Sequence, residues 1–184
     1  MAKTAQWVIE ACEDIVSDDG TRWGDAWLDF INVAQLSIAQ KHPTATVKED
    51  NVKLSPGAVQ RCPDDAMAFN KLICNMGSDG TTVGKAILPC DEFALSSFNP
   101  SWMTEESGTE ILNYMPSQED PTQYKVYPPA SNAQDVYVKL EYRTVPAKCL
   151  NFSDTLSVAD EFLPELVEMV AKMALSSETE AKRM

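Results

Sequence analysis

The acidic residues are the first candidates for chemistry, and their spacing argues against a shared catalytic site. Adjacent acids occur as Asp64-Asp65, Asp91-Glu92 and Glu105-Glu106. Neighbouring residues of a strand or helix point in different directions, so no pair brings two carboxylates to one substrate or metal ion. Asp91 and Glu92 instead suit the first turn of a helix, where acids interact favourably with the helix dipole. A hydrolase using Asp64 and Glu92 would need both in one pocket with a perturbed pKa, and nothing in the sequence indicates this.

The thiols and the imidazole are the second set of candidates. The five cysteines are Cys12, Cys62, Cys74, Cys90 and Cys149, and no two are spaced Cys-x-x-Cys. Their odd number, and an N-terminus without the apolar core of a signal peptide, favour free buried thiols in a reducing cytoplasm. The single histidine, His42, stands beside Pro43 and is typical of a helix end rather than of a Cys–His nucleophile pair. We therefore expect no catalytic residue, no metal site and no cofactor.

A glycine-rich segment could be mistaken for a phosphate loop. Gly77, Gly80 and Gly84 are close in sequence, but the Gly-Lys-Ser/Thr that cradles phosphate is missing. The segment also precedes an expected strand rather than a helix. We predict a hairpin loop at Gly77–Thr82, between strands at Met67–Met76 and Val83–Leu88.

The charge balance excludes a binder that relies on a basic surface. The chain has 15 Lys and Arg against 28 Asp and Glu, which gives a net charge of −13. Such a surface repels phosphate backbones. The acids are spread along the chain, which indicates a solubilising surface or an acidic wall along which DNA slides without binding. The apolar runs are only a few residues long, so we expect no segment that spans a membrane.

Helical periodicity marks both ends of the chain. Apolar residues recur at helical spacing over Ala5–Val16, and a second helix begins at Thr21 or Asp25 and ends at His42-Pro43. The second helix carries an apolar stripe of Trp27, Phe30, Ile31, Ala34 and Ile38, with Asp29, Asn32 and Gln35 placed off it. A last helix begins between Ser157 and Asp160, with Pro164 in its first turn. We expect these helices to pack together as one domain, 1–48 plus 157–184.

The middle of the chain, 49–156, has the pattern of strands and turns. Expected strands are Val52–Leu54, Ala58–Cys62, Met67–Met76 with a bulge, Val83–Leu88, one around Tyr114, Tyr124–Tyr127 closed by Pro128-Pro129, and Val136–Val145. A short helix after Asp91 should stop at Asn99-Pro100, because a residue before proline is pushed out of the helical region. The expected fold class is α+β, an antiparallel helical bundle with a large antiparallel β-rich insertion.

The order of these motifs resembles the head-to-tail adaptor proteins of tailed bacteriophages, also called connector or head-completion proteins. The matching motifs are Arg22-Trp23, Leu28-x-Phe-Ile-Asn32-x-Ala-Gln35 followed by His42-Pro43, Pro63-Asp64, Asn75-Met76-Gly77-x-Asp79-Gly80, Asn99-Pro100-x-Trp102, Tyr124-x-Val126-Tyr127-Pro128-Pro129, Val136–Tyr142 and Asp160-Glu161-Phe162. They cover nearly the whole chain, and their order and spacing carry the resemblance more than any single motif does.

The resemblance implies a structural protein of the virion rather than an enzyme. Such adaptors form a ring, usually of twelve copies, beneath the portal protein at the capsid vertex. The ring extends the channel for genomic DNA, which passes without sequence-specific binding, and it offers a platform for the tail tube or nozzle protein. The C-terminal segment of such adaptors commonly reaches the portal.

Several residues are candidates for protein interfaces. Aromatic residues are enriched at interfaces, which points to the β-rich insertion. Apolar residues on the last helix could meet another subunit. The candidates are Trp102, Tyr114, Tyr127, Met169, Met173, Lys182 and Arg183. An alternative is a small β-sandwich module that binds carbohydrate or peptide on an exposed platform of Trp102 and the tyrosines.

Overall fold

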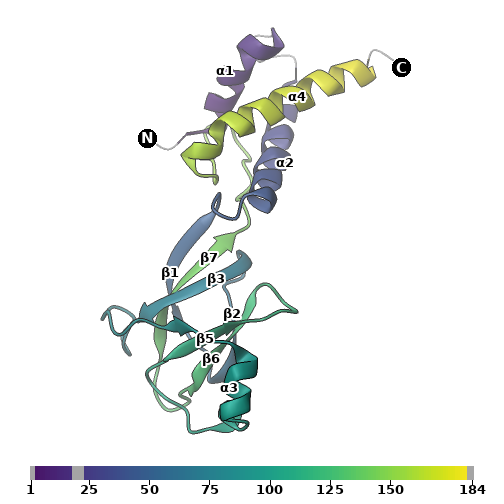
Figure 1. Cartoon of the computed structure of the whole chain (residues 1–184). Coiled ribbons are helices and arrows are strands. Elements are labelled where there is room, and N and C mark those ends of the chain that lie inside the picture. The colour runs from purple at the N-terminus through teal and green to yellow at the C-terminus, as the bar shows by residue number, and fades with distance from the viewer. Residues whose placement is uncertain (1–2, 18–22, 182–184) are drawn as a thin grey trace. The chain divides into compact units, whose positions relative to one another are not determined.

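The computed structural model describes residues 3–17 and 23–181, and its contacts divide the chain into two compact units (Figure 1). Residues 1–46 and 145–184 form the helical unit, and residues 47–144 form the β-rich unit. The predicted α+β class is confirmed: the N-terminal helices pack on the C-terminal helix, and a β-sheet insertion lies between them in sequence.

The helical unit consists of α1 (Ala5–Val16), α2 (Ala26–Lys41) and α4 (Leu163–Ala181), with a 3-10 turn, η2 (Asp160–Phe162), before α4. Of the three helices, α4 packs on both of the others (Figure 1). The core comes from the apolar stripes, since Val8, Cys12, Trp27, Ile31, Ile38, Leu166 and Val170 are each completely buried. The predicted bounds of α1 and the predicted end of α2 at His42 are confirmed. Thr21, one of the two expected caps of α2, lies outside the described residues.

The segment 145–156 belongs to the helical unit, whereas we expected it in the insertion. Its backbone pairs with the start of α1: the amide of Ala5 donates to the carbonyl of Asp154 over 3.0 Å, and that of Gln6 donates to Phe152 over 2.8 Å. The amide of Leu156 donates to the carbonyl of Lys3 over 2.9 Å. The first two bonds supply partners for amides that the first turn of a helix leaves unsatisfied.

The β-rich unit holds two sheets. The first has the strand order β1 (Val47–Lys53), β7 (Tyr137–Thr144), β3 (Ala66–Asn75) and is antiparallel throughout. The second has the order β2 (Gly57–Arg61), β6 (Gln123–Ala130), β5 (Asn113–Pro116), β4 (Leu88–Pro89), in which β4 and β5 run parallel. The central strand β7 alternates as predicted, with Val138, Leu140 and Tyr142 completely buried. The bulge expected in β3 is present as register shifts against β7.

Two expected strands differ in the structure. Val83–Leu88 does not return as a strand: Ala86 makes an isolated bridge to Cys74, and only Leu88 enters a strand. The loop before it is held locally, since Asp79 accepts hydrogen bonds from the backbone and hydroxyl groups of Thr81 and Thr82.

The strand β6 does not close at Pro128-Pro129 but continues to Ala130. On β2, Gly57 pairs with Ala130 while Val59 pairs with Lys125, so the register shifts between these pairs. Pro128 and Pro129 lie inside this irregular stretch and pair with no residue of β2. Proline is tolerated there because it has no amide hydrogen to donate to a neighbouring strand.

The short helix α3 (Glu92–Phe98) is confirmed, with its stop at Asn99-Pro100. The Asp91 side chain caps it by accepting from the amide of Ala94 over 2.8 Å. A 3-10 turn, η1 (Trp102–Thr104), follows. Within the described residues, no helix combines the length and apolar character that crossing a bilayer requires.

Candidate interaction surfaces

The aromatic interface candidates lie largely inside the β-rich unit. Trp102 is 2% exposed and Tyr114 is 7% exposed, while Tyr127 is half-buried with its ring centroid 6.4 Å from that of Trp102. The Trp102 indole donates to the hydroxyl of Ser96 over 3.1 Å. The buried rings leave little of Trp102 or Tyr114 for a carbohydrate or a second subunit to contact.

The other candidates belong to the last helix and the C-terminal residues. Met169 and Met173 are half-buried and pack against the helical core. Lys182 and Arg183 lie outside the described residues.

The candidate chemical groups are engaged in local structure. Asp65 accepts from the hydroxyl of Tyr142 over 3.2 Å and lies 3.3 Å from the amine of Lys48, and Glu92 forms an ion pair with Lys125. Burial raises the pKa of the Cys12 and Cys62 thiols to about 11, so both are protonated and weakly nucleophilic at neutral pH. In the part of the chain that the structure describes, no three acids, cysteines or histidines are grouped as metal ligands would be.

Nine of the twelve lysines and arginines in the described part of the chain form ion pairs with its own acids. Every described lysine and arginine makes such an ion pair except Lys3, Arg143 and Lys148. On the exposed face of the first sheet, for example, Lys139 meets Glu49 at 2.6 Å and Lys71 meets Glu141 at 3.0 Å. Among the described residues, the charged groups that form no ion pair are therefore mainly acids.

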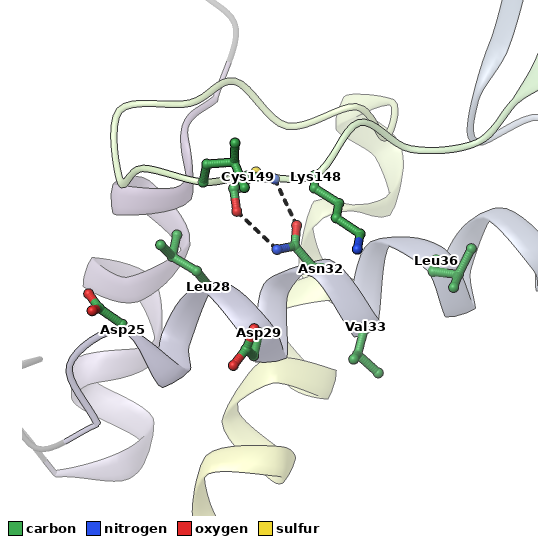
Figure 2. Close-up of a pocket in the computed structure, with 9 residues that line it drawn as sticks. Asp25, Leu28, Asp29, Asn32, Val33, Leu36, Lys148 and Cys149 are labelled. Atoms are coloured by element: carbon green, nitrogen blue, oxygen red, sulfur yellow. Dashed lines mark hydrogen bonds between the residues drawn. The ribbon is translucent and has the colours of Figure 1, made fainter. Parts of the chain in front are cut away.

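An open groove of about 760 Å³ lies beside α2 in the helical unit (Figure 2). Its lining is largely apolar, with Val33 57% and Leu150 75% exposed. The exposed acids Asp25 and Asp29 and the unpaired Lys148 also line it. An apolar groove that carries both signs of charge is suited to a protein segment rather than to a small charged substrate.

Two amide side chains of α2 hold the wall of this groove in place. Asn32 accepts from the amide of Cys149 over 2.8 Å and donates to the same residue's carbonyl over 3.0 Å (Figure 2). Gln35, which is completely buried, accepts from the amide of Ser157 over 2.7 Å. We had placed both residues off the apolar stripe and assigned them no role. They fix the segment 145–157 on α2, so they position Lys148 and Leu150.

A polar contact joins the end of α2 to the start of α4. Glu165 lies 2.6 Å from the amine of Lys41 and 2.9 Å from Nε2 of His42, whose ring lies against Phe162 with centroids 4.8 Å apart. His42 is thus at a helix end, as predicted, and it also contacts α4 through Glu165.

Replacing Glu165 by glutamine should lower the melting temperature at neutral pH. Lys41, followed by His42, holds the pKa of this carboxyl below its ordinary value of 4.5. A carboxyl whose pKa is lowered by folding stabilises the native state above its unfolded pKa, and that contribution is lost as the pH falls through the folded pKa. The melting temperatures of wild type and Glu165→Gln should therefore converge as the pH falls below the pKa of Glu165 in the folded protein. Glu161→Gln, at an exposed acid of η2, is the control, and an undiminished Glu165→Gln effect in acid would contradict this role.

One exposed apolar surface was not foreseen. On α3, Phe93 is 82% and Phe98 is 91% exposed, and no residue of this helix is fully buried. From the sequence we expected there only a short helix that stops at Asn99-Pro100.

Comparison with known proteins gives the chain a family. No curated protein matches the sequence significantly. The family model described as SU10 adaptor protein matches residues 3–183, nearly the whole chain. That name implies a structural rather than a catalytic role, consistent with acids and thiols that serve local structure. The chain belongs to the SU10 adaptor protein family, a family of phage adaptor proteins.

Proposed function

We propose that this protein is a head-to-tail adaptor of the virion, which forms a ring, of twelve copies, beneath the portal protein at the capsid vertex. The ring extends the DNA channel and provides the platform to which the tail tube or nozzle protein attaches. The observation that carries the proposal is the family match over residues 3–183. In this proposal the helical and β-rich units are two domains of one structural subunit of the ring.

The charge distribution supports a channel through which DNA passes without binding. The net charge is −13, and nine of the twelve described cations are already paired with acids of the same chain. Such a surface offers few free cations to phosphates, so it lacks the electrostatic contribution that dominates non-specific DNA affinity. The genome therefore moves past the protein without sequence-specific contact.

The α2 groove is the surface we assign to contact between copies. A closed ring needs two different, complementary patches on each subunit. The groove presents apolar side chains to water and carries Asp25 and Asp29 together with Lys148 on its rim, so a neighbouring copy can supply both apolar area and opposite charges. The half-buried Met169 and Met173 of α4 are assigned to the same contact between copies, and Lys182 and Arg183 are assigned to the portal contact.

A double substitution, Val33→Asp with Leu36→Asp, should abolish the ring while leaving the monomer folded. Both side chains are more than 40% exposed, so the substitutions cost the monomer little. In the covered groove two carboxylates would be desolvated, and the single lysine of its lining, Lys148, can pair with only one of them. Mass by light scattering and negative-stain microscopy, each with the portal protein present, measure the result.

Val83→Asp is the matched control, because Val83 is 72% exposed and lies in the β-rich unit. A wild-type protein that stays monomeric and does not bind the portal protein would contradict the proposed function. If the double variant forms rings as well as the wild type does, the α2 groove is not the surface of contact between copies.

A further inference from the structure

The helix α3 exposes two phenylalanines to water, and hydrogen bonds and an ion pair attach this helix to the rest of the β-rich unit. Phe93 and Phe98 are the two most exposed large apolar side chains among the described residues. Only Leu95 of this helix packs against the small core cluster around Trp102 and Met115. Leaving two rings in water forfeits the hydrophobic stabilisation that their burial would give, which marks such a patch as an interaction site.

The support of the two rings is built from polar contacts at both ends of the helix. Asp91 caps the first turn, and Glu92 is tied to Lys125 of β6. At the other end, Ser96 accepts from the buried Trp102 indole over 3.1 Å, and the amide of Asn99 donates to the carbonyl of Leu95 over 2.8 Å. A helix fixed in this way presents its side chains in advance of binding, which lowers the entropic cost of association.

The surroundings of the rings are acidic. Asp91 and Glu92 begin the helix, and Glu105 accepts from the side chain of Asn99, the residue after Phe98, over 2.7 Å. Glu92 forms an ion pair with Lys125, so the acids of this patch that have no cationic partner among the described residues are Asp91 and Glu105. The patch therefore complements an apolar socket whose rim carries lysine or arginine.

A second copy of this chain is poorly suited to supply that socket. Within the described residues, the cations without an ion pair are Lys3, Arg143 and Lys148. The apolar α2 groove offers Lys148, but Asp25 and Asp29 line the same groove and would face the acids of α3. Like charges brought together at an interface oppose association.

We propose that α3 inserts Phe93 and Phe98 into a basic-rimmed apolar socket on a virion protein other than this one. The inference rests on the proposed function, which places the adaptor against non-identical neighbours in the particle. The two rings are the anchors, and Asp91 and Glu105 favour a basic partner surface.

A photo-crosslinking experiment in assembled particles tests the identity of the partner. Particles are assembled with p-benzoylphenylalanine in place of Phe98, irradiated, and the crosslinked peptides sequenced. We expect crosslinks to a different virion protein, at apolar residues flanked by lysine or arginine. The same probe in place of Val83, exposed but outside the patch, should not give that product. Crosslinks to peptides of this chain, or none in particles that contain the probe, would overturn the proposal.

A second experiment separates this inference from the proposed function. The variant Phe93→Ser with Phe98→Ser should keep the wild-type melting temperature and the wild-type ring on the portal, because both rings are exposed. Its affinity for the crosslinked virion protein, expressed and purified, should fall at least about tenfold per phenylalanine removed. Wild-type affinity should also fall as salt rises. A wild type that forms no ring refutes the proposed function, whereas a normal ring with unchanged affinity of the variant refutes only this inference.

Discussion

Replacing Gln35 by alanine is expected to lower the free energy of unfolding of the helical unit by about 3 kcal/mol, the sum of a lost buried hydrogen bond and a cavity. The side chain is completely buried, and its oxygen accepts from the amide of Ser157 over 2.7 Å. Its amide nitrogen lies 3.6 Å from the sulfur of Cys149. Removing it leaves the Ser157 amide without its partner. Of the two α2 side chains that hydrogen-bond the segment 145–157, only Asn32 would then remain.

Urea unfolding followed by tryptophan fluorescence measures the loss, because Trp7, Trp23 and Trp27 all report on the helical unit. Gln40→Ala is the matched control: it removes the same side chain from an exposed position of the same helix, and it should change the free energy of unfolding by less than about 0.5 kcal/mol. Equal effects of the two substitutions would show that Gln35 does not fasten the segment 145–157.

The role of Gln35 could have been predicted in part from the sequence. It is four residues after Ile31 and three before Ile38, so helical geometry places it on the buried face with them. Its polarity argues for the exposed side, but its spacing argues for the buried one, and the structure follows the spacing. A polar residue on an apolar face of a helix signals a buried hydrogen bond.

The partners of these amides could not be predicted from the sequence. Asn32 and Cys149 are 117 residues apart, and no local pattern links them. The same limit explains the division of the chain: the segment 145–156 lacks helical periodicity, and only its bonds to α1 and α2 reveal its place. Local signals were sufficient for α1, for the stop of α3 at Asn99-Pro100 and for the alternation of β7.

The candidate surfaces show a different limit. Aromatic residues are frequent both in cores and at interfaces, so residue type alone could not separate Trp102, which is buried, from Phe98, which is exposed. The distinction depends on which side of α3 meets the rest of the unit. The side of α3 that meets the unit is set by the hydrogen bond between Trp102 and Ser96 and by the packing of Leu95. No local pattern in the sequence predicts these contacts.

Replacing Asn75 by alanine should destabilise the β-rich unit by about 3 kcal/mol, because it leaves buried backbone groups without partners. Asn75 ends β3 and is 6% exposed. Its side-chain oxygen accepts from the amide of Ile111 over 2.8 Å, and its nitrogen donates to the carbonyls of Ile111 over 2.8 Å and Lys85 over 3.1 Å. The segment Val83–Leu88 does not pair along β3 as a full strand. The Asn75 side chain supplies hydrogen bonds there that a neighbouring strand would otherwise make.

Hydrogen exchange of the buried amides of β7, followed in urea, measures this effect for the β-rich unit alone. Asn70→Ala is the matched control, since Asn70 lies on the same strand and makes a single 3.3 Å bond to Glu141, and its loss should cost about 1 kcal/mol or less. The melting of the helical unit should be unchanged in both variants. Because Ile111 is completely buried, no water can replace the lost partner without opening the core. An Asn75→Ala protein as stable as Asn70→Ala would mean that the segments at Lys85 and Ile111 are held by packing alone.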